Sequence, residues 1–186
     1  MATATALMTA AEFAAMPGTG TGTGTRTELV RGRIVEVPPP GLRHGYLCSR
    51  FIRLLGNHVA EHHLGAVISE SGVITRRDPD SVRGPDISFY SAAKLPPPDQ
   101  WGVYLDVPPD LVVEVRSPHD RWAEMVRKAA EYLAAGVLVV LVLDPDPRSA
   151  TVFGRDQAPQ TLGPGDTLTL PDILGDFALR VGDIFE

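Results

Sequence analysis

The chain has 186 residues, 44% hydrophobic content and a formal net charge of −6 at pH 7. This size and composition predict a single domain over residues 1–186 with a substantial core. The one cysteine, Cys48, excludes an internal disulfide, and no apolar run approaches the roughly 20 residues that span a bilayer. Because the first residues also lack the basic segment of a signal peptide, we expect a cytoplasmic protein with no membrane contact.

The charges are unevenly distributed along the chain. Residues 26–130 contain 14 Lys and Arg against 13 Asp and Glu, whereas residues 131–186 contain 3 against 9. Arginines in the first region could bind a polyanion locally, but a large basic surface with a steep salt dependence is not predicted. We therefore expect any intrinsic affinity for DNA to be weak.

The N-terminal region, residues 1–25, predicts a short helix followed by a flexible connector. Thr9 and Glu12 have the spacing of a capping box, and Pro17 ends the helix. Residues 18–25 alternate glycine and threonine and offer no aliphatic side chain to bury. Their glycines do not follow any nucleotide-binding pattern, which excludes a phosphate loop.

A hairpin and a long helix are predicted next. Residues 27–37 form two β-prone runs around Arg31 and Gly32, and three prolines follow them. From His44 to about His63, apolar residues recur at three- and four-residue spacing, which indicates an amphipathic helix. We expect Gly65 to close this helix.

The remaining pattern predicts strands at residues 66–75, 87–91, 111–115 and 137–143, and a shorter one at 151–153. An amphipathic helix over residues 121–135 lies between the third and the fourth strand, with Trp122, Val126, Ala129 and Leu133 on its apolar stripe and Ser117 as its N-cap. A strand, a crossover helix and a second apolar strand predict a parallel pair. The fold class is therefore α/β or α+β, a mixed β-sheet flanked by helices on both faces, with residues 163–186 wrapping the core.

Two carboxylates stand in segments that otherwise look buried. Asp86 opens one predicted strand, and Glu114 lies near the end of the next. Burying a carboxylate costs several kcal/mol unless a partner or a metal compensates. If the two strands pair, both side chains meet at one sheet edge, where they would suit Mg²⁺ or Mn²⁺ with Val115 adding its backbone carbonyl.

Lys128 lies at the flank of the apolar stripe of the following helix, from which its ammonium could reach the same edge. There it could orient an attacking water or offset charge on a phosphate. Each residue also has a purely structural interpretation. Asp86 could be a turn residue, Glu114 could pair with Arg116 or Arg121, and Lys128 could lie on the surface. The combination of the three favours a site.

This combination resembles a known family, the Uma2 (DUF820) group of the PD-(D/E)XK, or restriction-endonuclease-like, nucleases. The matching segments extend over nearly the whole chain: residues 8–13, 28–32, His44, 84–88, 108–118, 128–137 and 143–145. The resemblance implies a restriction-endonuclease-like core with an N-terminal β-hairpin extension. It also implies that Asp86 and Glu114 are metal ligands in an enzyme that hydrolyses DNA phosphodiesters.

One position departs from the general superfamily pattern. The lysine usually found two residues after the second carboxylate is replaced by Arg116, which stays charged and cannot carry a proton. In the Uma2-like arrangement the following helix supplies the lysine, here Lys128, and Arg116 becomes a candidate partner of phosphate or of Glu114. By the same resemblance Glu28 and His44 lie near the site, although His44 could equally be a helix-start residue bonded to backbone.

Two other functions stay open: a catalytically silent binding or assembly module with this fold, and a metal-dependent hydrolase of another phosphoester. Ser117, His119 and Asp120 are too close in the chain for a hydrolytic triad. The His58 and His62 pair has metal-ligand spacing but no further evident ligand. An exposed sheet edge, or the loop over residues 96–109 with Trp101 and Tyr104, would suit a homodimer.

Overall fold

The computed structural model describes residues 7–16 and 26–186. Helix α1 (Ala10–Ala14) has the predicted capping box, in which the Thr9 hydroxyl accepts from the Glu12 amide and the Glu12 carboxylate accepts from the Thr9 amide. The predicted Gly/Thr connector at residues 18–25 lies outside the described residues. Within the described ranges, no helix is long and apolar enough to cross a membrane.

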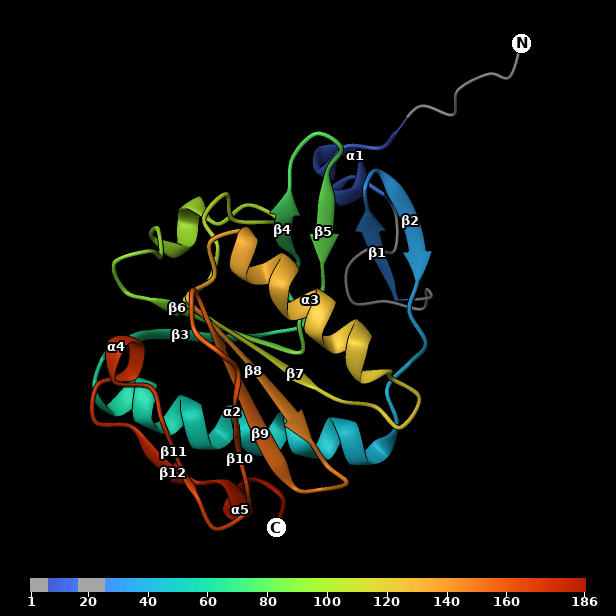
Figure 1. Ribbon diagram of the computed structural model, residues 1–186. Helices are drawn as coiled ribbons and strands as arrows, with labels where there is room; N and C mark the ends of the chain where they lie inside the picture. Colours follow the sequence, from blue (N-terminus) through green and yellow to red (C-terminus); the bar gives the residue numbers. More distant parts are fainter. Residues whose placement is uncertain (1–6, 17–25) are drawn as a thin grey trace.

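The core is a six-stranded mixed sheet (Figure 1). Its strands, in spatial order, are β10 (Gln160–Leu162), β9 (Ser149–Gly154), β8 (Val139–Asp144), β7 (Leu111–Val115), β6 (Ile87–Ser91) and β3 (Gly65–Ser69). Strands β7 and β8 are parallel and are joined by α3 (Trp122–Ala134), whereas the other neighbours are antiparallel. The predicted crossover and the mixed sheet are therefore confirmed.

Two helices cover opposite faces of this sheet. Side chains alternate between the faces of a strand, and in β7 Leu111, Val113 and Val115 pack with α2 (Leu42–Glu61), while Val112 packs with α3. Buried residues of α2 recur at positions 47, 51, 55 and 59, the periodicity that predicted the helix. Glu114 is two residues after Val112 in the same strand, so its side chain points to the same face, the one covered by α3.

A second, four-stranded sheet lies in the upper part of Figure 1. The predicted hairpin forms as β1 (Thr27–Val30) and β2 (Arg33–Glu36), and it is extended by β5 (Ser81–Arg83) and β4 (Val73–Arg76), with β1 pairing β5. The single strand predicted over residues 66–75 is wrong, because its two halves belong to different sheets, β3 and β4.

The C-terminal residues contribute to the main core. They form β11 (Thr167–Thr169), α4 (Pro171–Leu174), β12 (Ala178–Arg180) and α5 (Val181–Ile184). A short 3-10 turn, η1 (Pro98–Gln100), lies earlier in the chain, between β6 and β7. Leu168, Leu174 and Ile184 are fully buried in the cluster that α2 and the sheet share.

Three details of the helices differ from the predictions. Helix α2 begins at Leu42, so His44 lies in its first turn, and it ends at Glu61 with His62 as C-cap. Gly65 does not close it but starts β3. Helix α3 begins at Trp122, and Ser117 is not its cap.

The turn before α3 explains the displaced start. The Ser117 amide donates to the Asp120 carboxylate at 2.8 Å, and the Asp120 amide donates to the Ser117 carbonyl at 3.0 Å. These bonds close a separate turn, so the helix starts afterwards. Its buried stripe is Met125, Ala129 and Tyr132, whereas Trp122 and Val126 are 40% and 39% exposed.

Candidate active site

The pairing of β6 and β7 brings Asp86 and Glu114 together. Ile87 lies opposite Val113, which places Asp86, the residue before β6, beside the C-terminal end of β7. The Val115 amide donates to Asp86 Oδ2 at 2.8 Å. Asp86 and Glu114 are only 5% and 6% exposed. The two carboxylates thus meet at one end of the paired strands.

Glu114 is held from the α3 side. Lys128 Nζ lies 2.8 Å from Glu114 Oε1, and the Tyr132 hydroxyl donates to the same oxygen at 2.9 Å. Burial, with Asp86 nearby, raises the pKa of Glu114 to about 7 despite the opposing effect of Lys128. Burial acts to lower the pKa of Lys128, but Glu114 and Glu28 outweigh it and raise that pKa, so the lysine keeps its proton.

Glu28 of β1 supports Lys128 from the other sheet. Its Oε1 lies 3.5 Å from Lys128 Nζ and accepts from the Gly84 amide at 3.0 Å, while its Oε2 accepts from Arg83 at 2.9 Å. Burial opposes ionisation of Glu28, but Lys128, the Gly84 amide and Arg83 together lower its pKa. Arg83 is fixed in turn by two bonds to Glu131, at 3.0 and 2.7 Å. A continuous charged network therefore extends from Glu131 to Glu114.

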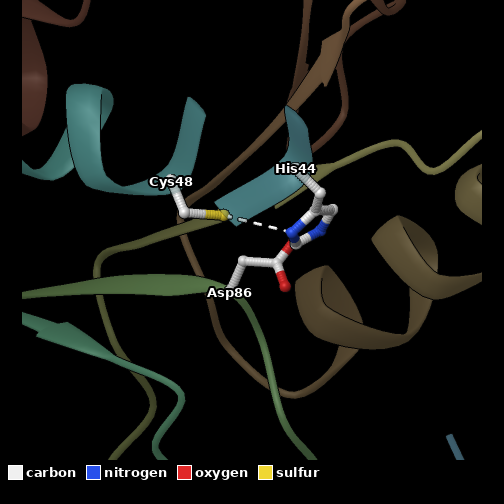
Figure 2. A group of neighbouring side chains, drawn as sticks. All are labelled: His44, Cys48 and Asp86. Carbon is white, nitrogen blue, oxygen red and sulfur yellow. Dashed lines mark hydrogen bonds and ion pairs between the residues drawn. The ribbon is translucent and has the colours of Figure 1, made fainter. Parts of the chain in front are cut away.

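His44 approaches Asp86 from α2. Its Nε2 lies 3.1 Å from Asp86 Oδ2, and its Nδ1 lies 3.5 Å from the Cys48 sulfur one helical turn later (Figure 2). The hydrogen bond to Asp86 is the main reason that the pKa of His44 is raised to about 10. Burial works against ionisation of Asp86, but His44 outweighs it and lowers that pKa. His44 therefore fixes the orientation of the carboxylate as an ion-pair partner.

These side chains line a cleft of about 590 Å³. Its wall also includes the proline run 38–40, the turn over residues 117–120, and Arg127. Arg26 reaches into it, donating to the Gly84 carbonyl at 2.7 Å and lying 3.7 Å from Asp86. All five residues predicted at the site, Asp86, Glu114, Lys128, Glu28 and His44, line this cleft, as does Val115.

The comparisons with known proteins agree on this fold. Residues 10–182 match the model of the Uma2 family, described as "Putative restriction endonuclease". The chain belongs to the Uma2 family. It is also similar to a solved structure from Anabaena variabilis ATCC 29413, described as a putative nuclease belonging to DUF820. That match has a TM-score of 0.82 and 20% identity, and it covers 96% of this chain and 97% of the other. A search of curated proteins found no match.

The Uma2 chain uses Arg116 differently from what the sequence suggested. Its guanidinium donates to Asp144 at 2.7 Å and to the Asp120 carbonyl at 3.2 Å. Arg116 is thus a partner of the β8 end and not of Glu114. The prediction of a Glu114 partner at this position is wrong: Arg116 lies just beyond the end of β7 and is held by Asp144 and the turn at Asp120, while Lys128 and Tyr132 bind Glu114.

Four residues that touch the site were not singled out as site residues: Arg26, Arg83, Glu131 and Tyr132. Arg83 ends β5 and Arg26 precedes β1, and these two strands pair only in the folded chain, so the sequence around either arginine does not indicate the site. Tyr132 has one: it lies four residues after Lys128, on the same side of the helix.

The histidines at the end of α2 acquire a third potential ligand that the sequence did not reveal. Asp176 Oδ1 lies 3.9 Å from His58 Nε2 and 3.7 Å from His62 Nε2. His58 Nε2 is engaged by the Leu174 carbonyl at 2.8 Å, and none of these residues lines the cleft. This surface cluster is separate from the candidate active site.

Proposed function

We propose that this protein is a metal-dependent endonuclease that hydrolyses DNA phosphodiester bonds with Mg²⁺ or Mn²⁺. The observation that carries the proposal is the meeting of Asp86, Glu114 and Lys128 in one cleft, from three separate elements. The Uma2 family description and the DUF820 neighbour support a nuclease.

The donor set fits such an ion. Two carboxylates with water and substrate phosphate are what Mg²⁺ commonly takes. The N–H and C=O of one strand residue point to the same neighbouring strand, and the Val115 N–H points to Asp86, so its carbonyl faces the same side. The raised pKa of Glu114 beside ionised Asp86 marks a place where an added positive charge is favourable. Asp86, Glu114 and Val115 would therefore hold the ion.

A bound divalent ion supplies charge to the phosphate and lowers the pKa of a water molecule. The chain's own residues orient and balance charge around it. Lys128 keeps its proton at Nζ beside Glu114, where it offsets negative charge that develops on the phosphate. Glu28 holds that ammonium in place, and His44 fixes the Asp86 carboxylate.

The cleft is not basic enough to bind DNA strongly by itself. Its positively charged lining residues are Arg26, Arg83, Arg127, Lys128 and the protonated His44, and they are balanced by the acidic residues Glu28, Asp86, Glu114, Asp120 and Glu124. A polyanion therefore gains little in this cleft until a cation occupies it. This supports weak intrinsic affinity for DNA that increases with the divalent ion.

The test is Mg²⁺ and Mn²⁺ binding by calorimetry, with cleavage of supercoiled plasmid measured on the same samples. We expect wild type to bind and to nick, and Asp86→Asn and Glu114→Gln to lose both. Asp110→Asn is the matched control: it removes a buried carboxylate at the other end of β7, outside the cleft. Its binding and nicking should match those of the wild type.

Other outcomes would favour the alternatives. Wild type that neither binds metal nor cuts would indicate a catalytically silent assembly module. Cleavage of a small phosphodiester that duplex DNA does not compete with would indicate another phosphoester as substrate. The proposal places the protein in the cytoplasm and includes a homodimer, which light scattering on a sizing column would detect.

A further inference from the structure

A second group of potential metal ligands shares Asp86 with the candidate Mg²⁺ site. Asp86, just before β6, and His44 and Cys48 of α2 point toward one another (Figure 2). His44 and Cys48 are separated by four residues on one helix and so lie on the same face. One ligand atom from each of the three residues lies within 4.8 Å of the others.

The chemistry of this group differs from that of the carboxylate pair. A cysteine sulfur, an imidazole nitrogen and a carboxylate oxygen are ligands of Zn²⁺ and Co²⁺, and three protein ligands leave a fourth position for water. Mg²⁺ prefers oxygen ligands and would not use the sulfur. Asp86 therefore stands between two environments: an all-oxygen one toward Glu114, and one with nitrogen and sulfur toward α2.

The distances are close to what a tetrahedral ion requires. Metal–sulfur and metal–nitrogen bonds of about 2.3 and 2.1 Å place the two ligand atoms roughly 3.6 Å apart. Cys48 Sγ and His44 Nδ1 already lie 3.5 Å apart. The Asp86 oxygen lies within 4.8 Å of the Cys48 sulfur, so it has to approach the sulfur by at most about 1.3 Å, and in doing so it leaves its bond to His44 Nε2. His44 and Asp86 line the cleft, so an ion can reach the group from solvent.

We propose that His44, Cys48 and Asp86 form a binding site for Zn²⁺ or a similar thiophilic divalent ion. Occupancy of this site withdraws Asp86 from the Mg²⁺ site and inhibits cleavage. The thiol proton passes to solvent as the metal thiolate forms. The inhibition rests on the proposed function, whereas the binding site does not.

Binding is tested by titrating the full chain with Co²⁺, without Mg²⁺ and with a phosphine reductant. A His62→Ala background removes the surface cluster at the end of α2 as a competing site. We expect one equivalent of Co²⁺ to give a thiolate-to-metal charge-transfer band and intense tetrahedral ligand-field bands, both lost on adding Zn²⁺. Cys48→Ala in the same background should lack the charge-transfer band. Cys48→Val serves if the alanine variant fails to fold.

A weak octahedral spectrum, the same with and without the cysteine, would overturn the proposed site. The regulatory part is tested by adding Zn²⁺ to Mg²⁺-driven plasmid cleavage, each protein measured relative to its own zinc-free rate. Loss of the sulfur ligand should raise the Zn²⁺ concentration for half inhibition by roughly tenfold or more. If Zn²⁺ inhibits the protein with Cys48 and the Cys48→Ala variant at the same concentration, the proposed inhibition through this site is overturned. An inactive wild type would refute the nuclease proposal alone, because the Co²⁺ spectrum decides the site independently.

Discussion

Replacing Lys128 with methionine tests whether the ion pairs of the cleft contribute to stability as buried pairs do. The change removes the ammonium 2.8 Å from Glu114 and 3.5 Å from Glu28 but keeps a side chain of similar length. Each carboxylate side chain is 8% exposed. Removing one partner of a buried pair costs about 3–5 kcal/mol. Because the Lys128 side chain is 23% exposed, we expect the lower end, about 3 kcal/mol at pH 8 in a metal chelator.

The effect should depend on pH with a definite sign. A carboxyl group whose folded pKa lies above its unfolded value stabilises the fold below the unfolded pKa, and this contribution is lost as the pH rises through the folded pKa. Burial raises the pKa of Glu114 from 4.5 to about 7, and loss of Lys128 raises it further. At pH 5 Glu114 is largely protonated in both folded proteins, so the loss should fall to about 1 kcal/mol.

The measurement is urea unfolding at pH 5 and pH 8, with EDTA, for wild type, Lys128→Met and the double variant Glu114→Gln with Lys128→Met. The double variant removes both charges and should recover most of the stability that the single variant loses at pH 8. A loss below about 1 kcal/mol at pH 8, as for an exposed pair, would refute the reasoning. An equal loss at both pH values would refute it as well.

Four further substitutions test the scaffold, and chemical unfolding measures the effect of each. Gly56→Ala, in α2 with open space around it, should stabilise by about 1 kcal/mol; Gly65→Ala, at φ +149° against a backbone carbonyl, should destabilise by about 1–3 kcal/mol. Phe51→Ala, fully buried under the sheet, should destabilise by about 3–5 kcal/mol. Burial opposes ionisation of Asp110, but a backbone amide and Lys94 lower its pKa, so Asp110→Asn should cost about 1–3 kcal/mol at pH 7. That cost should shrink as the pH falls below the ordinary value of 3.8 and through the lowered pKa of the folded state, where the stabilisation is lost.

Each of these has a contrary result. Equal effects of alanine at Gly56 and Gly65 would contradict the assigned backbone conformations. A loss under about 1 kcal/mol for Phe51→Ala would show that its pocket collapses or is solvated. A pH-independent effect of Asp110→Asn would mean that its charge contributes nothing.

The sequence predicted the central part of the fold well because its elements are long and regular. Strand β7 is apolar except for Glu114, the buried residues of α2 recur every four positions, and one crossover helix is enough to make β7 and β8 parallel. The prediction failed where neighbouring elements belong to different sheets. Residues 66–69 and 73–75 are both β-prone, and although Glu70, Ser71 and Gly72 between them are poor strand formers, nothing local shows that the two runs belong to different sheets. Strand β5 has three residues, too few to carry a periodicity.

The site was predictable to the extent that charge stands out in apolar segments. Asp86 and Glu114 were conspicuous for that reason, and their meeting followed from the pairing of adjacent strands. Arg83 and Glu131 were not conspicuous in the sequence. They bind each other across 48 residues, from β5 to α3, and this pairing exists only in the folded chain. Charged residues on an exposed helix face look the same whether or not another sheet supplies a partner.

The position of Lys128 on α3 has a consequence for how this site can change. A lysine on β7 itself would be placed by the strand backbone, whereas this ammonium is placed by how a helix sits on a sheet. Met125, Ala129 and Tyr132 determine that seating, and Tyr132 also contacts Glu114. A larger side chain at Ala129 would lift or rotate the helix and carry the lysine with it. A substitution at Ala129 therefore changes the chemistry of the cleft, although Ala129 itself does not line it.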